Sequence, residues 1–423
     1  MSRNTRKGGG RELEVQIAAM GARGDGLAKL PDDTPLFVPH ALPGERVRIR
    51  TAAKSDAGLR GDVIELLEES PERRDPICTN SARCGGCVFQ TWDPSAQIAW
   101  KQAQIDLAVQ RAGFAPEVIA PLISPANSGR RRARFVAHKG KLGFRERRSH
   151  DIIAVGPCMT LGPELQAFWR AIQGHPMLKQ QAEWTVTATS AGLDISIQSK
   201  AAAPNPIETQ DLIQHLGSHL GSVARFSWNE EVLLEVDAPR LDLGGLSPIL
   251  PPGGFLQPSP GGQDTLQHLV LDAIPASADW VADLYCGIGT FAVPLAARGH
   301  RVQALEAYEP AIAALDAAVR RDPTNTFKIH VGLRNLDHYP LQGDELTGFD
   351  ALVLDPPRAG ARSQARRLAE SNVSTVVTVS CNPTTWARDA ALLREGGYEL
   401  TKVTPVDQFP YTPHLELVAV FQK

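Results

Sequence analysis

Two residues in the last part of the sequence have the types needed for covalent chemistry. Cys381 lies in the polar segment SCNP, which directly follows the apolar run Thr375–Val379. A thiol at the end of a strand in an open α/β sheet lies where ligands bind, and its thiolate is a good nucleophile. Glu416 lies inside the apolar run Leu415–Phe421 and could accept a proton if it faces the same crevice. The alternatives are a buried cysteine acting as a small apolar residue and a glutamate facing solvent.

A glycine-containing loop could hold the second reactant. The segment DLYCGIGTF at residues 283–291 follows an apolar run and precedes a helical stretch, and Glu306 lies 19 residues beyond Gly287. An acid at that position can accept hydrogen bonds from ribose hydroxyls. The third glycine of the dinucleotide fingerprint is absent, which disfavours a pyrophosphate cofactor and favours one with a ribose but no phosphates, such as S-adenosylmethionine. The alternative is a structural strand–helix turn.

A third candidate segment is DPPRAG, which begins at Asp355 and follows the apolar run Ala351–Leu354. Its paired prolines stiffen the loop, so that the carboxylate of Asp355 can point into the same crevice.

The elements around these residues indicate a doubly wound α/β sheet. Apolar runs alternate with Ala-rich helical stretches from residue 264 onward, at Trp280–Leu284, Val302–Glu306, Phe327–Val331, Ala351–Leu354 and Thr375–Val379. The last two apolar runs, Tyr398–Val403 and Leu415–Phe421, are separated by little helical sequence and predict an antiparallel hairpin at the sheet edge.

The first part of the chain has a different pattern. Residues 1–10 are rich in glycine and basic residues and are interpreted as a flexible tail. Short alternating runs separated by turn residues predict a small β-barrel over residues 11–70. Residues 71–250 form a central α+β region with a predicted helix at 94–112, and a Pro/Gly-rich run precedes the last domain, residues 251–423.

Composition and charge narrow the functional class. Hydrophobic residues make up 43% and charged residues 22% of the 423 residues, which excludes a wholly disordered chain. No run approaches the roughly 20 apolar residues of a membrane-spanning helix. The net charge is −3, yet residues 1–150 carry +8 and the remainder −11, and Arg130–Arg148 holds nine basic residues and one acid. This segment predicts a polyanionic partner, the alternative being a solvated surface.

Taken together, the segments DLYCGIGTF, DPPRAG, SCNP and HLEL resemble the RNA (uracil-C5)-methyltransferase family, in its bacterial 23S rRNA branch. FVPHALPGERVRIR resembles a TRAM domain, and RRRARFVAHKGKLGFRER resembles the central RNA-binding segment of the family. The resemblance covers nearly the whole chain. It implies a multidomain protein with an OB-like TRAM barrel, a central α+β RNA-binding domain with a metal cluster, and a C-terminal methyltransferase domain on which helix 91–118 packs.

The resemblance also implies roles for individual residues. Cys381 adds to uracil C6 and Glu416 removes the C5 proton, giving 5-methyluridine. The implied cofactor-binding residues are Gln257, Tyr285, Gly287, Thr290, Glu306, Asn335 and Asp355. The implied RNA-binding residues are Arg130, Arg132, Arg134, Lys139, Phe144 and Arg145. The target uridine must be unpaired or flipped out of its helix, because a stacked base cannot reach such a pocket.

Six cysteines in a long chain without a signal peptide predict reduced thiols in the cytoplasm. The resemblance implies that four of them, Cys78, Cys84, Cys87 and Cys158, are the ligands of a 4Fe-4S cluster. That cluster would be structural or would position RNA. Four thiolates also suit a structural zinc ion, which stays an alternative. Cys286 is left over and is interpreted as a packing residue.

The sequence departs from the family pattern at two places. Ser259 stands where the family commonly has asparagine, two residues after Gln257. The usual Tyr-Arg-Asn-Arg becomes Gly129 followed by three arginines, so that Arg131 replaces an amide.

Several alternatives stay open at this stage. The RNA could be transfer RNA rather than ribosomal RNA. DPPR resembles the (D/N)PP[YF] motif of nitrogen methylation, although Arg358 replaces the aromatic residue, and a non-catalytic RNA-binding protein is a third possibility. We expect RNA as partner, no membrane, and a monomer.

Overall fold

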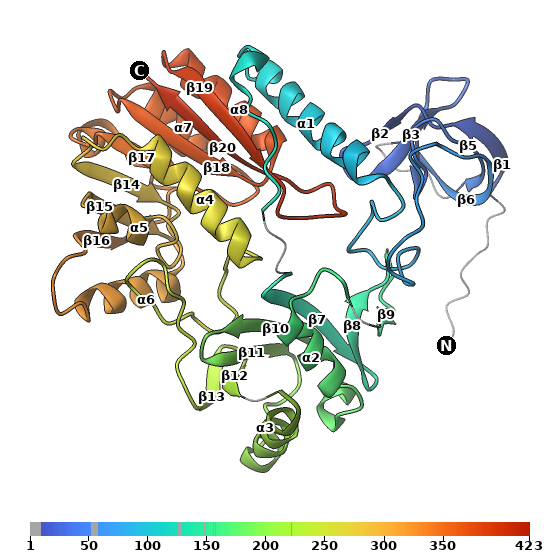
Figure 1. The fold of residues 1–423 in the computed structure, drawn as a ribbon, viewed down its shortest axis with the longest axis horizontal. Coiled ribbons are helices and arrows are strands. Elements are labelled where there is room, and N and C mark those ends of the chain that lie inside the picture. Colours follow the sequence, from blue (N-terminus) through green and yellow to red (C-terminus); the bar gives the residue numbers. More distant parts are fainter. Residues whose placement is uncertain are drawn as a thin grey trace. The chain divides into compact units, whose positions relative to one another are not determined.

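The computed structural model describes residues 10–51, 58–125, 129–147, 149–154, 156, 158–220 and 222–423 (Figure 1). The chain divides into two compact units. The first comprises Met1–Gln104 with Phe409–Pro413, and the second comprises Ile105–Gln408 with His414–Lys423.

The first unit contains a six-stranded sheet in the order β1-β5-β6-β4-β3-β2. The strands are β1 (Glu12–Gln16), β2 (Ala19–Met20), β3 (Asp25–Lys29), β4 (Pro35–Pro39), β5 (Arg46–Thr51) and β6 (Leu59–Glu68). Alternate residues point into its core, among them Val15, Leu36, Val47 and Ile49. The closure of this sheet into a barrel stays a prediction.

An aromatic cluster follows the cysteine-rich segment of the first unit. The rings of Phe89 and Trp100 lie 5.2 Å apart and pack with Met20 and Leu42. Helix α1 (Pro94–Arg111) begins there, because Asp93 accepts hydrogen bonds from the first backbone N–H groups, and the predicted helix 94–112 is confirmed.

The second unit contains two sheets. The central sheet has the order β13-β12-β11-β10-β7-β8-β9 and is antiparallel except for the β11–β12 pair. Its elements are β7 (Arg132–His138), β8 (Lys141–Arg145), β9 (Ile152–Ile153), α2 (Pro163–Ala171), η2 (Pro176–Lys179), β10 (Ala182–Thr189), β11 (Gly192–Ser199), α3 (Pro206–Leu220), β12 (Val223–Trp228) and β13 (Glu231–Glu235). Helices α2 and α3 contact each other and pack on β10 and β12. The predicted central α+β region is therefore confirmed in its secondary structure.

The C-terminal sheet has the order β16-β15-β14-β17-β18-β20-β19, with only the last two strands antiparallel to their neighbours. Its strands are β14 (Trp280–Leu284), β15 (Arg301–Glu306), β16 (Ile329–Leu333), β17 (Ala351–Leu354), β18 (Thr375–Ser380), β19 (Glu399–Val406) and β20 (Glu416–Gln422). The accompanying helices are α4 (Pro260–Ala273), α5 (Ala292–Ala297), α6 (Glu309–Arg320), α7 (Arg362–Ala369) and α8 (Pro383–Glu395), and η1 (Pro116–Val118) and η3 (Gly343–Leu346) are short 3₁₀ turns. The predicted doubly wound sheet and its antiparallel edge hairpin are confirmed.

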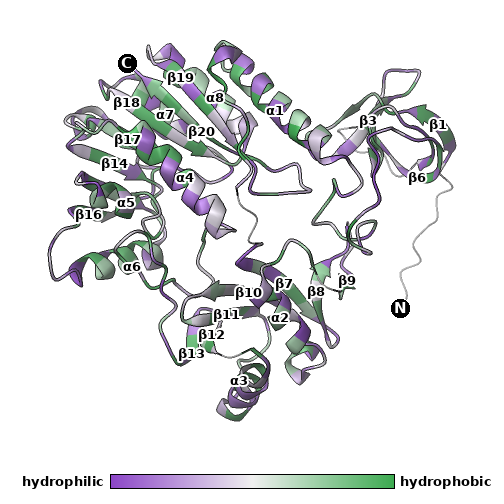
Figure 2. Cartoon of the chain, in the orientation of Figure 1, coloured by the Kyte–Doolittle hydropathy of each residue, from purple (hydrophilic) through white to green (hydrophobic). Residues whose placement is uncertain are grey.

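Two hydrophobic cores cover the two faces of the C-terminal sheet, and Figure 2 shows hydrophobic residues along its strands β17 and β18. One core includes Leu266 of α4 and Leu295 of α5. The other includes Val109 of α1 and Leu393 of α8, so the second half of α1 packs in the core of this sheet. The chain after α1 then runs beside the edge strand β19, where Ala120 N–H donates to the carbonyl of Val403.

The strand order reverses between β14 and β17, and the carboxyl ends of the strands at such a reversal are where open α/β sheets commonly bind ligands. Within the described residues, every helix is too short or too polar to span a lipid bilayer.

Candidate active site

The loop from Tyr285 to Thr290 leads from β14 into α5 and has the shape of a ligand cradle. Tyr285, Gly287 and Gly289 all have positive φ angles, of 63°, 57° and 96°. A Cβ atom on Gly289 would lie 2.8 Å from the Leu315 side chain, which explains the need for glycine there. A Cβ atom on Gly287 would meet no atom within 4 Å, so this side of the loop faces open space.

Glu306 ends β15 and lies against the same loop. Its Oε2 accepts a hydrogen bond from Gly287 N–H at 3.0 Å, and its Oε1 accepts from the N–H groups of Ala307 and Tyr308 at 2.7 and 2.8 Å. The structure therefore brings together the loop and the acid that the sequence predicts to bind a ribose.

Two other predicted cofactor residues border this loop. The Tyr285 hydroxyl donates to Asp337 Oδ1 at 3.1 Å, and Asn335 Oδ1 accepts from the N–H groups of Asp337 and His338. Burial, reinforced by Asp337, raises the pKa of Tyr285, so its hydroxyl stays neutral. The carbonyl of Thr290 accepts a hydrogen bond from Gln267 Nε2 at 2.8 Å, which ties the loop to α4.

Three acids converge at the ends of the adjacent strands β14, β15 and β17. Burial and the Glu306 charge raise the pKa of Asp355 to about 7. Burial and the Asp355 charge raise the pKa of Asp283, which is fully buried, well above its usual value. Asp283 was not among the predicted site residues, although it precedes the loop in the sequence. Such a cluster favours a cationic ligand, and a sulfonium compound with a ribose fits the loop, Glu306 and this charge.

The predicted nucleophile and base lie at the same edge as Asp355. Cys381 directly follows β18, Glu416 begins β20, and Ser380 pairs with Leu417 across the two strands. Glu416 is only 6% exposed, so it is not a solvent-facing residue. Burial and the Asp355 charge raise its pKa to about 8.

Arg358 of the DPPRAG loop lies beside the thiol. Burial and the Glu416 charge raise the pKa of Cys381, whereas a hydrogen bond and the positive charge from Arg358 oppose that increase. The carbonyl of Arg358 accepts a hydrogen bond from Asn382 Nδ2 at 3.0 Å, and Asn382 Oδ1 caps α8 by accepting from Thr384 N–H. The residue pattern DPPRAG did not by itself predict that Arg358 would lie beside Cys381.

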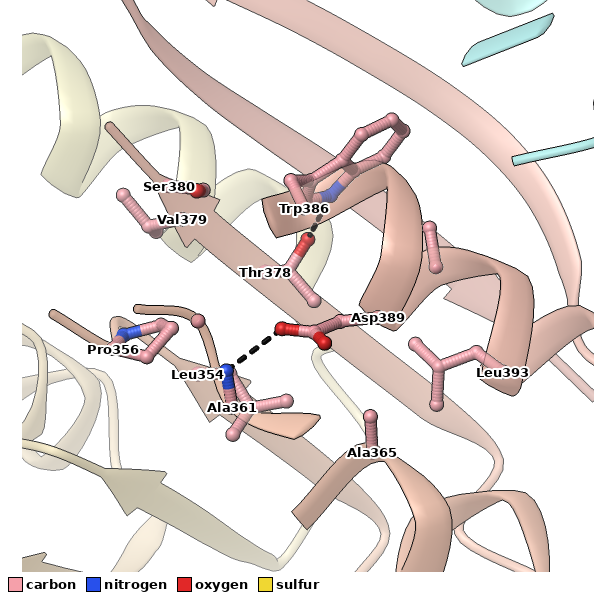
Figure 3. Close-up of a pocket in the computed structure, with 12 residues that line it drawn as sticks. Leu354, Pro356, Ala361, Ala365, Thr378, Val379, Ser380, Trp386, Asp389 and Leu393 are labelled. Carbon is pink, nitrogen blue, oxygen red and sulfur yellow. Dashed lines mark hydrogen bonds between the residues drawn. The ribbon is translucent and has the colours of Figure 1, made fainter. Parts of the chain in front are cut away.

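Helix α8 holds the turn that ends the DPPRAG loop. Asp389 Oδ2 accepts a hydrogen bond from Ala361 N–H at 2.7 Å, and Trp386 Nε1 donates to Thr378 Oγ1 at 3.0 Å (Figure 3). The cavity between these groups is about 20 Å³, enough for one water molecule. It therefore supports the loop and is too small for a substrate.

Gln257, a predicted cofactor residue, is 4% exposed, and its Oε1 accepts a hydrogen bond from Gln408 Nε2 at 3.0 Å. Ser259, the departure from the family pattern, caps α4 by accepting from Gly262 N–H at 3.1 Å.

The predicted RNA-binding residues divide into two groups. Arg130, Arg132 and Phe144 are half-buried: Arg132 donates to the carbonyl of Gly253 at 3.0 Å, and the Phe144 ring packs 5.1 Å from that of Phe135. Arg134, Lys139 and Arg145 are exposed, and Arg145 forms an ion pair with Glu183 at 3.7 Å. The last residue of the predicted basic segment, Arg148, lies outside the described residues.

All six cysteines are among the described residues and are thiols rather than disulfides. Cys78, Cys84 and Cys87 belong to the first unit and Cys158 to the second. Four thiols have the right chemistry for iron–sulfur or zinc, but in the described ranges no group of three or more potential ligands is arranged to hold a metal ion. The cluster therefore stays a prediction from sequence. Cys286 is buried in the core, in agreement with its predicted packing role.

Comparison with known proteins identifies the family. The pattern described as tRNA (Uracil-5-)-methyltransferase matches residues 250–423, and the TRAM domain pattern matches residues 6–64. A relative from Caulobacter vibrioides named as an uncharacterized RNA methyltransferase is 40% identical, with 97% of this chain and 100% of the relative covered. A 23S rRNA (uracil(1939)-C(5))-methyltransferase, RlmD, of Vibrio campbellii is 31% identical, with 98% and 96% covered.

This chain belongs to the RNA (uracil-5-)-methyltransferase family. It is accordingly an S-adenosylmethionine-dependent RNA methyltransferase that acts on C5 of uracil. The fold agrees with the solved structure of the Pyrococcus abyssi tRNA (uracil-54, C5)-methyltransferase in complex with S-adenosyl-L-homocysteine, with a TM-score of 0.75, 21% identity, and 97% and 99% of the two chains covered. The two alternatives of nitrogen methylation and non-catalytic RNA binding therefore lose their support.

Proposed function

We propose that this methyltransferase modifies a uridine of 23S rRNA through a covalent bond between Cys381 and uracil C6. The observation that carries the proposal is the convergence of Cys381, Glu416 and Asp355 at one edge of the sheet, beside the loop that fits a sulfonium nucleoside.

The reaction begins with the Cys381 thiolate. Its sulfur bonds to C6, the C5–C6 double bond opens, and the electron pair moves to C5 and the O4 enolate. Arg358 assists because its hydrogen bond and charge favour the thiolate. S-adenosylmethionine, when bound, would supply an electrophilic methyl group to the nucleophilic C5 and leave as S-adenosylhomocysteine.

Glu416 completes the reaction as a base. Its carboxylate removes the C5 proton, the C5–C6 double bond reforms, and the bond between C6 and Cys381 breaks to release the thiolate. Gln257, Tyr285, Gly287, Thr290, Glu306 and Asn335 hold the cofactor, and Asp355 holds either the cofactor or the edge of the uracil.

RNA binds to the basic surface of the central sheet, with the exposed residues Arg134, Lys139 and Arg145 contacting phosphates. The half-buried residues Arg130, Arg132 and Phe144 support that surface. We assign domains to residues 11–70, 71–250 and 251–423, after a tail at 1–10, and keep the predicted 4Fe-4S cluster, or zinc, as a structural element.

Ribosomal RNA is favoured by the full-length similarity to the RlmD protein. A tRNA uridine is the second candidate, because the matching family description names tRNA. Mapping 5-methyluridine in both RNAs from a strain lacking this gene decides between them, since only the true target loses its methyl group.

The covalent step has its own test. Cys381→Ala should bind S-adenosylmethionine with unchanged affinity and form no adduct with RNA containing 5-fluorouridine. An adduct with this variant on denaturing gels would exclude Cys381 as the nucleophile.

A further inference from the structure

Gln408 and Glu416 lie at the same end of the terminal hairpin. Val406 of β19 pairs with Glu416 of β20, and Gln408 follows two residues later. Both side chains are buried, with 5% and 6% of their surface exposed. Gln408 Nε2 donates a hydrogen bond to Gln257 Oε1 at 3.0 Å, and a second hydrogen bond from the same amide group lowers the pKa of the Glu416 carboxyl.

The orientation of this amide is costly. Gln408 Oε1 is buried and has no hydrogen-bond partner among the described residues. That oxygen lies against the first turn of α4, where a Cβ atom on Gly262 would come within 2.1 Å of it. The fold therefore leaves an acceptor unsatisfied so that the NH₂ group points at Gln257 and Glu416.

Gln257 is in turn held by Arg131, the residue that directly precedes β7. Arg131 Nε donates to the Gln257 carbonyl at 3.1 Å, and its Nη2 donates to Gln263 Oε1 at 2.7 Å. Its backbone N–H also donates to the carbonyl of Pro258. Burial lowers the pKa of Arg131 to about 10, so the guanidinium is still charged at neutral pH.

A continuous series of hydrogen bonds thus leads from Arg131 through Gln257 and Gln408 to Glu416. Arg131 stands where the family pattern has asparagine, and Ser259, the other departure, lies in the same loop two residues after Gln257. The two departures found in the sequence therefore meet at one place in the structure.

We propose that Gln408 is the positioning residue for Glu416, and that Arg131 and Gln257 fix the Gln408 amide in place. The proposal rests on the proposed function, in which Glu416 removes the C5 proton. An N–H donor stabilises the ionised carboxylate, the form that can accept this proton, and it also fixes the direction of the carboxylate.

The main test is Gln408→Met, which keeps the length of the side chain and removes the donor. Two steps are measured separately in the full-length enzyme with unmodified 23S rRNA transcripts. Adduct formation with 5-fluorouridine RNA reports the attack of Cys381. Because that base has no C5 proton to remove, the reaction stops at the adduct before the step assigned to Glu416. Tritium release from RNA containing [5-³H]uridine reports the step performed by Glu416.

We expect adduct formation to change little, whereas tritium release at pH 7 falls about tenfold, the effect of one unit in the pKa of Glu416. The rise of tritium release with pH should move to higher pH by about one unit, and release should recover in alkaline buffer. A side chain that only supports packing would not be rescued in this way.

Two further variants disturb the Gln408 amide without changing Gln408 itself. Gly262→Ala displaces the amide directly, and Arg131→Met releases Gln257, so both should shift the pH dependence in the same direction. The matched control is Gln364→Met: Gln364 is fully buried and bonds both backbone groups of Leu341, at 2.9 and 3.0 Å. This control should lower stability and leave the pH dependence unchanged.

Unaltered tritium release and pH dependence in Gln408→Met would overturn the proposal. So would an equal loss of adduct formation and tritium release at every pH, because Gln408 would then be a packing residue. If the wild-type enzyme forms no adduct with 5-fluorouridine RNA, the covalent mechanism fails and the proposal with it. If the wild-type enzyme forms the adduct and the variants keep the wild-type tritium release and pH dependence, the positioning role of Gln408 is refuted and the covalent mechanism stands.

Discussion

Arg358 Nη2 lies 2.9 Å from His414 Nδ1, so the loop after β17 meets the segment before β20 at the edge of the sheet where Cys381 lies. The same guanidinium forms a hydrogen bond with the Cys381 thiol. Arg358 thus contacts His414 on one side and favours the thiolate of Cys381 on the other.

The first prediction concerns this arginine. Arg358→Met should slow adduct formation with 5-fluorouridine RNA by about 10- to 100-fold, since a hydrogen bond to a charged group contributes about 1.5–3 kcal/mol. Arg358→Lys keeps the charge and should retain part of the rate. Denaturing gels of samples quenched at successive times measure the rate of adduct formation. Equal rates for the methionine variant and the wild type would remove Arg358 from the mechanism.

The second prediction is an alkaline pH dependence. Glu416, with a pKa of about 8, and Cys381, whose pKa is also raised, must both lose a proton to act. Turnover should therefore be low at pH 6 and rise with pH through about 8. Methyl transfer measured in constant-ionic-strength buffers checks this, and a rate that falls over that interval would contradict the assignment of both groups.

The third prediction concerns the turn at Gly360, which ends the DPPRAG loop. Gly360 has a φ of 80°, and a Cβ atom there would lie 2.3 Å from Asp389 Oδ2. Gly360→Ala should lower the free energy of unfolding by more than the roughly 1–2 kcal/mol of a left-handed residue alone. Gly299→Ala is the control, with a φ of 99° and no atom within 4 Å. Urea denaturation compares them, and equal losses would mean that the Asp389 contact does not matter.

The fourth prediction concerns the cofactor. Glu306→Gln should weaken S-adenosylmethionine binding at least about tenfold, because the carboxylate holds Gly287 N–H and is the predicted acceptor for the ribose hydroxyls. Glu309→Gln, an exposed acid three residues later, is the control. Calorimetry gives both dissociation constants, and the idea is wrong if the two variants bind alike.

The fifth prediction concerns RNA. Arg134→Ala and Lys139→Ala should each weaken binding and lower the slope of log affinity against log salt by about 0.7, the value for one phosphate contact to a single strand. Arg298→Ala, an exposed arginine paired with Asp272 on the C-terminal sheet's helices, should leave the slope unchanged. Filter binding over a salt series distinguishes the outcomes.

Local patterns in the sequence were sufficient for much of the fold. Apolar runs predicted β14, β17 and β18 closely, because consecutive buried residues in a parallel sheet are encoded without reference to distant parts of the chain. The strand predicted at Phe327–Val331 begins two residues later, at Ile329, since Phe327 packs instead against the core beside Gly245.

The proposed nucleophile, Cys381, and the proposed cofactor loop could be predicted from the sequence, because each lies in a short segment whose residue types suit the chemistry assigned to it. The surroundings of Glu416 could not. Its burial depends on the pairing of β20 with β18 and β19, and its donor, Gln408, is oriented by Gln257 and Arg131. Such contacts join residues far apart along the chain, so only strand order and register, which arise in the tertiary structure, decide them.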